Sequence, residues 1–116
     1  MYNQAGKELA MLYDIKMESM PREELKALQL KRLQDVANRV YYNVPFYHKR
    51  FDELGVKPTD IRSLDDIRRL PFTTKQDLRD RYPLGFMAVP RENIARLHAS
   101  SGTTGQAVVG CYTKRD

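Results

Sequence analysis

The sequence contains little cysteine, no tryptophan and no long apolar run. Cys111 is the single cysteine among 116 residues, which excludes an internal disulfide and a zinc site built from several thiolates. The apolar runs, such as residues 9–13 and 86–89, fall far short of the ~20 apolar residues that span a membrane. The first seven residues lack a basic segment followed by an apolar stretch, so we expect no secretory signal. These absences predict a cytoplasmic protein without a membrane partner.

The charge is basic in sum but mixed in order. Lysine and arginine number 20 against 15 acidic residues, a net charge of +5. Clustered basic residues would favour nucleic-acid binding, because they displace counterions from a phosphate backbone. Here basic pairs stand beside acidic residues, as Lys49 and Arg50 stand beside Asp52 and Glu53. The pattern therefore favours a solvated surface, and we expect no nucleic-acid partner.

The first three quarters of the chain carry helical patterns. Apolar residues recur near every 3.6 positions over residues 21–42, which predicts an amphipathic helix. Proline at its first turn and at the start of 45–54, with Gly55 after the latter, predicts two successive helices. Between them, residues 41–47 hold four of the eleven Phe and Tyr residues. This aromatic segment is either a packing corner or one wall of a ligand pocket.

Two further short helices are expected from capping residues. Ser63 followed by Asp66 resembles a capping pair, and the next helix is capped by Thr73 or Thr74 and extends to Tyr82. Residues 14–85 are therefore predicted to be helical.

The last part of the sequence favours β-structure. Residues 94–99 and 107–112 have the composition of two short strands. They predict a strand–loop–strand unit over residues 94–113. Because a two-stranded hairpin is marginally stable alone, we expect it to be part of something larger. The predicted fold class is α+β, α-rich with a β-hairpin near the C-terminus.

The loop between these strands, residues 100–105, contains only serine, threonine and glycine (SSGTTG). Such a loop can offer backbone amides and hydroxyls to phosphate oxygens, but these are also ordinary turn residues. It is not a Walker A loop, since Cys111 and Tyr112 stand where lysine and serine or threonine are required. From these residues alone, an anion cradle and a flexible turn both stay open.

The loop lies within a longer pattern that resembles phenylacetate-coenzyme A ligases, members of the adenylate-forming enzymes. The resemblance extends from about residue 13 to the last residue. Its blocks, in order, are MESMPREEL at 17–25, NVPFY at 43–47, LPFTTK at 70–75, AVPR at 88–91 and LHASSGTTG at 97–105. Several ordered blocks are far more specific than the loop alone. The resemblance implies that residues 1–116 form the N-terminal part of the large, AMP-binding domain of such an enzyme.

The resemblance also implies a reaction and a set of contacts. These ligases join an aryl acid to ATP as an acyl adenylate, and coenzyme A then captures the acyl group. The cofactors and substrates implied are ATP, Mg²⁺, coenzyme A and an arylacetate. The implied ATP-phosphate contacts are Ser100, Ser101, Gly102, Thr103, Thr104 and Gly105. His98 is a candidate for positioning the loop or the substrate, and a buried strand histidine that is hydrogen-bonded nearby is the alternative.

This chain departs from the family in two ways. Many members carry lysine and proline after the loop, whereas this sequence has Gln106 and Ala107, which removes a cation near the phosphates. The family's aryl pocket, adenine contacts, metal-binding acid and catalytic lysine lie beyond the equivalent of Asp116. We therefore expect no catalytic residue and no metal ligand here, no tightly bound cofactor, and no activity without the remainder of the ligase. The alternative is a noncatalytic binding module or structural remnant of the same fold.

Overall fold

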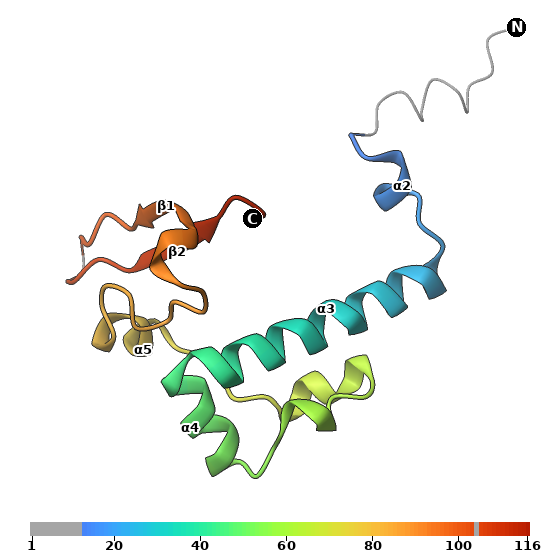
Figure 1. Ribbon diagram of the computed structural model, residues 1–116, viewed down its shortest axis with the longest axis horizontal. Helices are drawn as coiled ribbons and strands as arrows, with labels where there is room; N and C mark the ends of the chain where they lie inside the picture. Colours follow the sequence, from blue (N-terminus) through green and yellow to red (C-terminus); the bar gives the residue numbers. More distant parts are fainter. Residues whose placement is uncertain (1–12, 104) are drawn as a thin grey trace, which may run out of the picture.

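The computed structural model describes residues 13–103 and 105–116, and its architecture is the predicted α+β type. Figure 1 shows one long helix, smaller helices packed along one side of it, and a β-hairpin near its C-terminal end. The expectation for the first seven residues lies outside the described part of the chain.

All the helices of the described residues precede the two strands in the chain. The α-helices are α2 (Ile15–Glu18), α3 (Arg22–Asn43), α4 (Pro45–Glu53) and α5 (Lys75–Asp80). The 3₁₀-helices are η1 (Pro58–Asp60), η2 (Leu64–Arg69) and η3 (Arg91–Asn93), and the strands are β1 (Ile94–Ala99) and β2 (Val109–Thr113). The helices predicted over 21–42 and 45–54 are confirmed to within one residue at each end.

The buried core lies where α3, α4 and η1 meet. Its side chains are apolar or aromatic: Ala37, Tyr41, Phe51, Val56 and Ile61. The end of α4 directs the chain back into this core through two hydrogen bonds, from the Gly55 amide to the Asp52 carbonyl and from the Val56 amide to the Phe51 carbonyl, each 3.0 Å. This is the Schellman motif, which is commonly accompanied by a contact between apolar residues on its two sides. Here these residues are Phe51 and Val56, which share the core cluster.

The predicted capping pairs are present, although the helices they begin are shorter or tighter than expected. Asp66 accepts hydrogen bonds from the amide and hydroxyl of Ser63, but η2 is a 3₁₀-helix. Thr74, and not Thr73, caps α5. This helix ends at Asp80 rather than Tyr82, because a residue that precedes proline avoids helical geometry.

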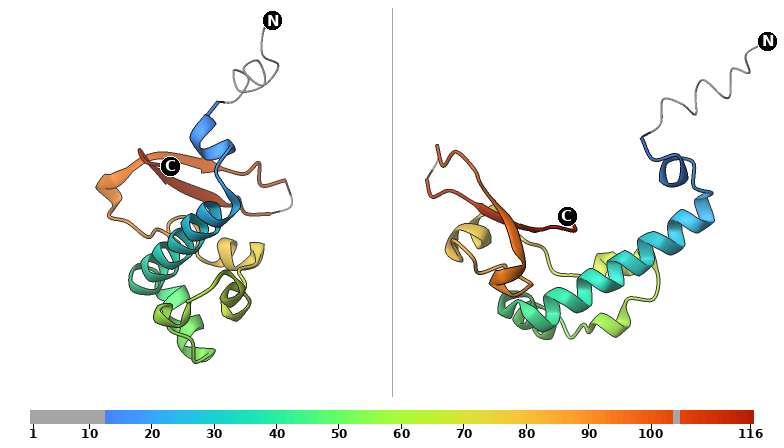
Figure 2. Two further views of the ribbon diagram at one scale, coloured as in Figure 1. Left: turned by 90° about the vertical axis from the view of Figure 1, so that its right-hand side faces the viewer. Right: turned by 45° about the horizontal axis from the view of Figure 1, so that its top comes forward.

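The two strands form an antiparallel hairpin in which Leu97 pairs with Cys111 and His98 with Gly110. The first predicted strand, residues 94–99, is confirmed. The second begins at Val109, two residues later than expected. No residue of either strand is buried. Figure 2 shows the hairpin and α2 rising from opposite ends of α3, so the hairpin stands apart from the core.

Candidate functional site

The serine, threonine and glycine loop lies at the tip of the hairpin, and Ser100 closes its base. The Ser100 amide donates to the Val108 carbonyl at 2.9 Å. In return the Val108 amide donates to Ser100 Oγ, also at 2.9 Å. The side chain thus replaces a backbone carbonyl as the acceptor, which ends the regular ladder here. Among residues 13–103 and 105–116 no acceptor binds the hydroxyl proton of Ser100, so this hydroxyl can also donate.

Gly102 begins a tight turn within the loop. The Gly105 amide donates to the Gly102 carbonyl at 3.1 Å, and Gly102 has φ of +67°. A Cβ at position 102 would lie 3.0 Å from the Gly105 carbonyl oxygen. Both the left-handed φ and this close approach require glycine, so the path of the loop depends on it.

The outer part of the loop presents donors to solvent. Ser101 and Thr103 are exposed. Among residues 13–103 and 105–116, none accepts a hydrogen bond from the amides of Ser101, Gly102 or Thr103. Successive amides beside a left-handed residue form a concave cradle that suits an anion. The donors of this loop could therefore bind phosphate, as predicted. Thr104, one of the predicted contacts, lies outside the described residues.

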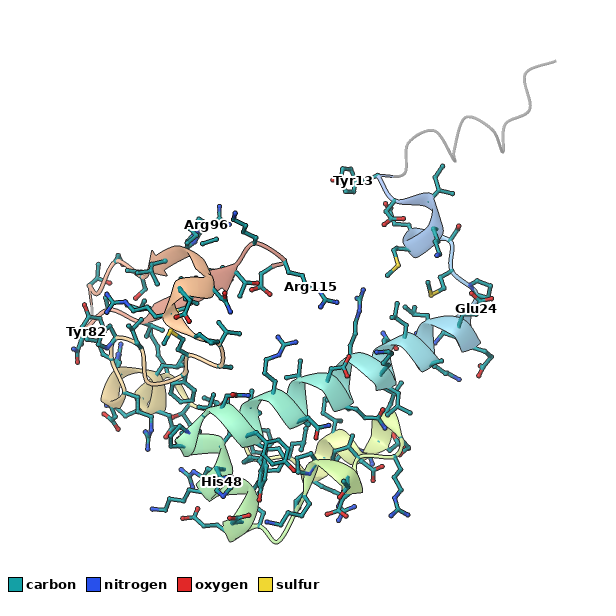
Figure 3. All side chains as sticks on the ribbon, viewed as in Figure 1. Tyr13, Glu24, His48, Tyr82, Arg96 and Arg115 are labelled. Carbon is teal, nitrogen blue, oxygen red and sulfur yellow. The ribbon has the colours of Figure 1, made fainter. Side chains whose placement is uncertain are left out.

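His98 lies on β1 two residues before the loop and is exposed. Its ring stands edge-on to the ring of Tyr112 on β2, with centroids 5.2 Å apart and planes at 61°. The same face of the hairpin carries Arg96, which pairs with Tyr112 and extends outward in Figure 3. His98 therefore neighbours an aromatic ring and is accessible to solvent, so the alternative of a buried strand histidine is wrong.

Cys111 is half-buried and contributes to the wall of a cavity of about 320 Å³. The cavity lies between the hairpin, α3 and the segment after α5. Its other lining residues include Arg39, Leu78, Phe86 and Ile94. This environment fits a packing role for the Cys111 side chain.

The aromatic segment at residues 41–47 forms a packing corner. Tyr41 is 7% exposed and Phe46 is 6% exposed. The rings of Tyr41 and Phe51 lie 5.6 Å apart in an edge-to-face arrangement, and that of Phe46 lies 4.9 Å from that of Phe86. Of the two interpretations, packing is the one that the contacts support, because these rings fill the space between them.

A polar cluster on this corner could not be anticipated from the sequence. The Tyr41 hydroxyl donates to Asp52 Oδ1 at 3.0 Å and accepts from Lys57 Nζ at 2.7 Å. Lys57 also forms an ion pair with Asp52, and His48 Nε2 lies 3.3 Å from Asp52 Oδ2. Figure 3 shows His48 on α4, away from the hairpin. The cluster ties the end of α3 to α4 and the following turn.

These contacts favour the ionised forms of Asp52 and Lys57. Hydrogen bonds from Lys57 and then from Tyr41 lower the pKa of Asp52 below its ordinary value. The same bonds, to Asp52 first and Tyr41 second, raise the pKa of Lys57. Lys57 is consequently held as a cation, which makes it a poor nucleophile or base. We assign this cluster to structure.

Two kinds of site can be assessed directly in the described ranges, 13–103 and 105–116. They contain no group of three or more His, Cys, Asp or Glu side chains that could hold a metal ion. Every helix in them is too short or too polar to cross a bilayer.

Comparison with known proteins gives strong matches to one kind of enzyme. No protein-family model matches the chain. It is 55% identical over 106 residues to a phenylacetate-coenzyme A ligase of Thermus thermophilus, a match that covers 91% of this chain and 24% of that protein. It is 51% identical over 100 residues to the phenylacetate-coenzyme A ligase of Escherichia coli, covering 86% of this chain and 23% of the relative.

Solved structures agree with the sequence matches. A 2-hydroxyisobutyryl-CoA ligase in complex with 2-HIB-AMP and CoA, in the thioesterification state, superposes with a TM-score of 0.74 at 32% identity. The match covers 85% of this chain and 22% of that one. An open conformation of the same ligase gives a TM-score of 0.70 at 30% identity, covering 82% and 21%. The resemblance inferred from the ordered sequence blocks is confirmed: the chain is a relative of the phenylacetate-coenzyme A ligases over 24% of the length of the Thermus enzyme.

Proposed function

We propose that the chain supplies the ATP-phosphate loop of an AMP-forming phenylacetate-coenzyme A ligase, as the N-terminal part of its large domain. The observation that most supports this is the 55% identity over 106 residues, which includes a loop whose donors face solvent. The contacts proposed are those of the sequence pattern, at Ser100, Ser101, Gly102, Thr103, Thr104 and Gly105. We propose a cytoplasmic location for the protein, because its single cysteine fits a reducing compartment.

The loop residues would act as fixed donors in the first half-reaction. When a carboxylate attacks the α-phosphorus of ATP and pyrophosphate leaves, negative charge gathers on the phosphate oxygens. Amides of Ser101, Gly102 and Thr103, which have no acceptor among the described residues, could stabilise that charge. Ser100 keeps the loop base closed during this step.

The other parts of such a site are proposed to lie outside this chain. Mg²⁺ would accompany the ATP phosphates, and the part of the chain that the structure describes holds no acidic cluster for it. We propose that the remainder of the ligase supplies the metal-binding acid, the aryl pocket and the coenzyme A contacts. The chain alone is then expected to show no phenylacetate-dependent exchange of pyrophosphate into ATP.

The proposal is tested by a chimera. This chain replaces the matching segment of the Thermus thermophilus ligase, and phenylacetate-dependent ATP–pyrophosphate exchange and thioester formation are measured. We expect exchange in the chimera, and its loss when Gly102→Val distorts the loop. Thr59→Val, at an exposed residue of η1, is the control and should retain exchange. A chimera that folds and binds phenylacetate yet gives no exchange would instead favour a noncatalytic module.

A further inference from the structure

The hairpin that carries the loop has little support of its own. Neither strand contains a buried residue, and two strands without a covered face are marginal in water. The ladder also ends in a side-chain bond at Ser100. The direction of the loop amides must therefore depend on what holds the last strand pairs together.

Tyr112 is placed to do this. Its ring lies across Gly110, so that a Cβ built at Gly110 would be 3.2 Å from both Cε2 and the hydroxyl oxygen of Tyr112. The same ring meets the edge of His98, the cross-strand partner of Gly110, with 5.2 Å between centroids. An aromatic ring that covers a strand glycine and a diagonal neighbour fixes the register and twist of a strand pair.

We propose that His98, Gly110 and Tyr112 form a brace that orients the phosphate loop, with Tyr112 and His98 as positioning residues that need not touch the ligand. The braced pair lies two residue pairs from the loop base, since His98 pairs with Gly110, Ala99 with Val109, and Ser100 bonds Val108. Gly110 is required because any side chain there would displace the ring. The identity of the ligand as phosphate rests on the proposed function, whereas the brace itself rests only on the contacts of these three residues.

The experiment uses the 116-residue chain and inorganic tripolyphosphate, followed by nuclear magnetic resonance of the backbone amides. In the unmodified chain the ring current of Tyr112 should move the Gly110 Hα signal upfield. Tyr112→Ala should abolish that shift, displace the loop amide signals and weaken tripolyphosphate binding by about three-fold or more, within the range of a cross-strand contact. Tyr112→Phe keeps the ring and should restore all three readouts.

Leu97→Ala is the matched control, because Leu97 is on β1, is 58% exposed and alternates with His98 on the opposite face. It should leave the loop amides and the binding unchanged. Gly110→Ala retains the ring but pushes it away, and should change the loop amides in the same direction as Tyr112→Ala without removing aromatic surface.

The outcomes separate the two proposals. The brace is overturned if Tyr112→Ala and Gly110→Ala shift the loop amide signals no more than Leu97→Ala does. If the loop amides move but the unmodified chain binds no tripolyphosphate, the brace stands and the phosphate-binding function fails. Loss of affinity in Tyr112→Ala that Tyr112→Phe does not rescue would also contradict the brace, because it would assign the effect to the hydroxyl.

Discussion

The Asp52 carboxylate is the shared partner of Tyr41, His48 and Lys57 in the polar cluster. Because the pKa of its carboxyl is lowered in the folded chain, chiefly by Lys57 and then by Tyr41, its stabilising contribution is present above the unfolded pKa of 3.8. The contribution is lost as the pH falls through the lower folded value. Lys57, whose pKa is raised, stays charged throughout this range.

We predict that the urea midpoint of the chain decreases between about pH 5 and about pH 2.5, where carboxylates titrate. Asp52→Asn should lower the midpoint at about pH 5 and reduce its pH dependence. The control is Asp65→Asn, at an exposed residue for which no hydrogen bond or ion pair occurs among the described residues. If the two variants have the same pH dependence, the Asp52 cluster does not contribute to folding as argued.

A substitution at Gln106 can test the effect of the positive charge that this loop lacks. It is exposed and follows the loop directly, at a position where the resembling ligases often carry lysine. Gln106→Lys should strengthen tripolyphosphate binding by about two- to five-fold at low ionic strength, the size of an exposed ion pair. The gain should vanish at about 0.5 M salt, where screening shortens the range of charges.

The control for this prediction is Gln29→Lys, which adds the same charge at an exposed position on α3. Titration calorimetry at low and high salt measures both variants. An equal gain in both would mean that net charge, and not the loop, attracts the anion.

Residue-level patterns predicted what depends on neighbours in sequence and missed what depends on neighbours in space. The pair of Thr74 and Asp77 lies within one helical turn, so a capping rule could place it. The contact of Tyr41 with Lys57 spans 16 positions and exists because α4 turns back against α3. Likewise, the family resemblance implies that Ser100 contacts phosphate, but it could not show that the Ser100 side chain closes the loop.

At the scale of elements, Phe51 anchors α4 in the core; it is one of the two buried aromatic side chains of this helix, with Phe46. Phe51 is 2% exposed and packs within the core cluster, whereas Phe72 is 92% exposed. Removing a buried phenylalanine costs about 3–5 kcal/mol, through lost burial and the cavity left behind. Phe51→Ala should therefore destabilise the chain by that amount or prevent folding, while Phe72→Ala changes stability by less than about 0.5 kcal/mol.

Urea denaturation followed by far-ultraviolet circular dichroism measures both variants. Phe51→Leu keeps most of the volume and should fold with an intermediate loss, which secures the comparison if Phe51→Ala does not fold. Similar midpoints for Phe51→Leu, Phe72→Ala and the unmodified chain would mean that α4 is not anchored through this ring.

The elements that sequence predicted well are those with a proline or glycine at a defined end. Pro45 fixes the start of α4, and Gly55 with Val56 fixes its end by local hydrogen bonds. The second strand was placed two residues too early because Val108 has strand-like composition, yet its amide bonds the side chain of Ser100. Composition cannot distinguish a ladder bond from a side-chain bond.

At the scale of the whole molecule, the buried side chains come from one stretch of the sequence. In the described ranges, the buried apolar side chains all lie between Ala37 and Ile61. The hairpin instead exposes Leu97 and Tyr112, although it carries the candidate site. Since the chain spans 24% of the Thermus relative, we attribute this uneven burial to a surface that the remainder of a ligase would cover.

Hydrogen exchange should report this difference directly. Amides of α3 and α4 around Tyr41 and Phe51 are expected to exchange only through global unfolding, whereas β1 and β2 should exchange through local opening at much lower free energy. In the chimera with the Thermus ligase, the hairpin amides should become protected to the level of the helices, because a covered sheet opens only with the core. Exchange measured by mass spectrometry on both proteins tests this. Equal protection of hairpin and helices in the isolated chain would mean that the hairpin is stable without a covering partner, and the proposed interface would have no physical basis.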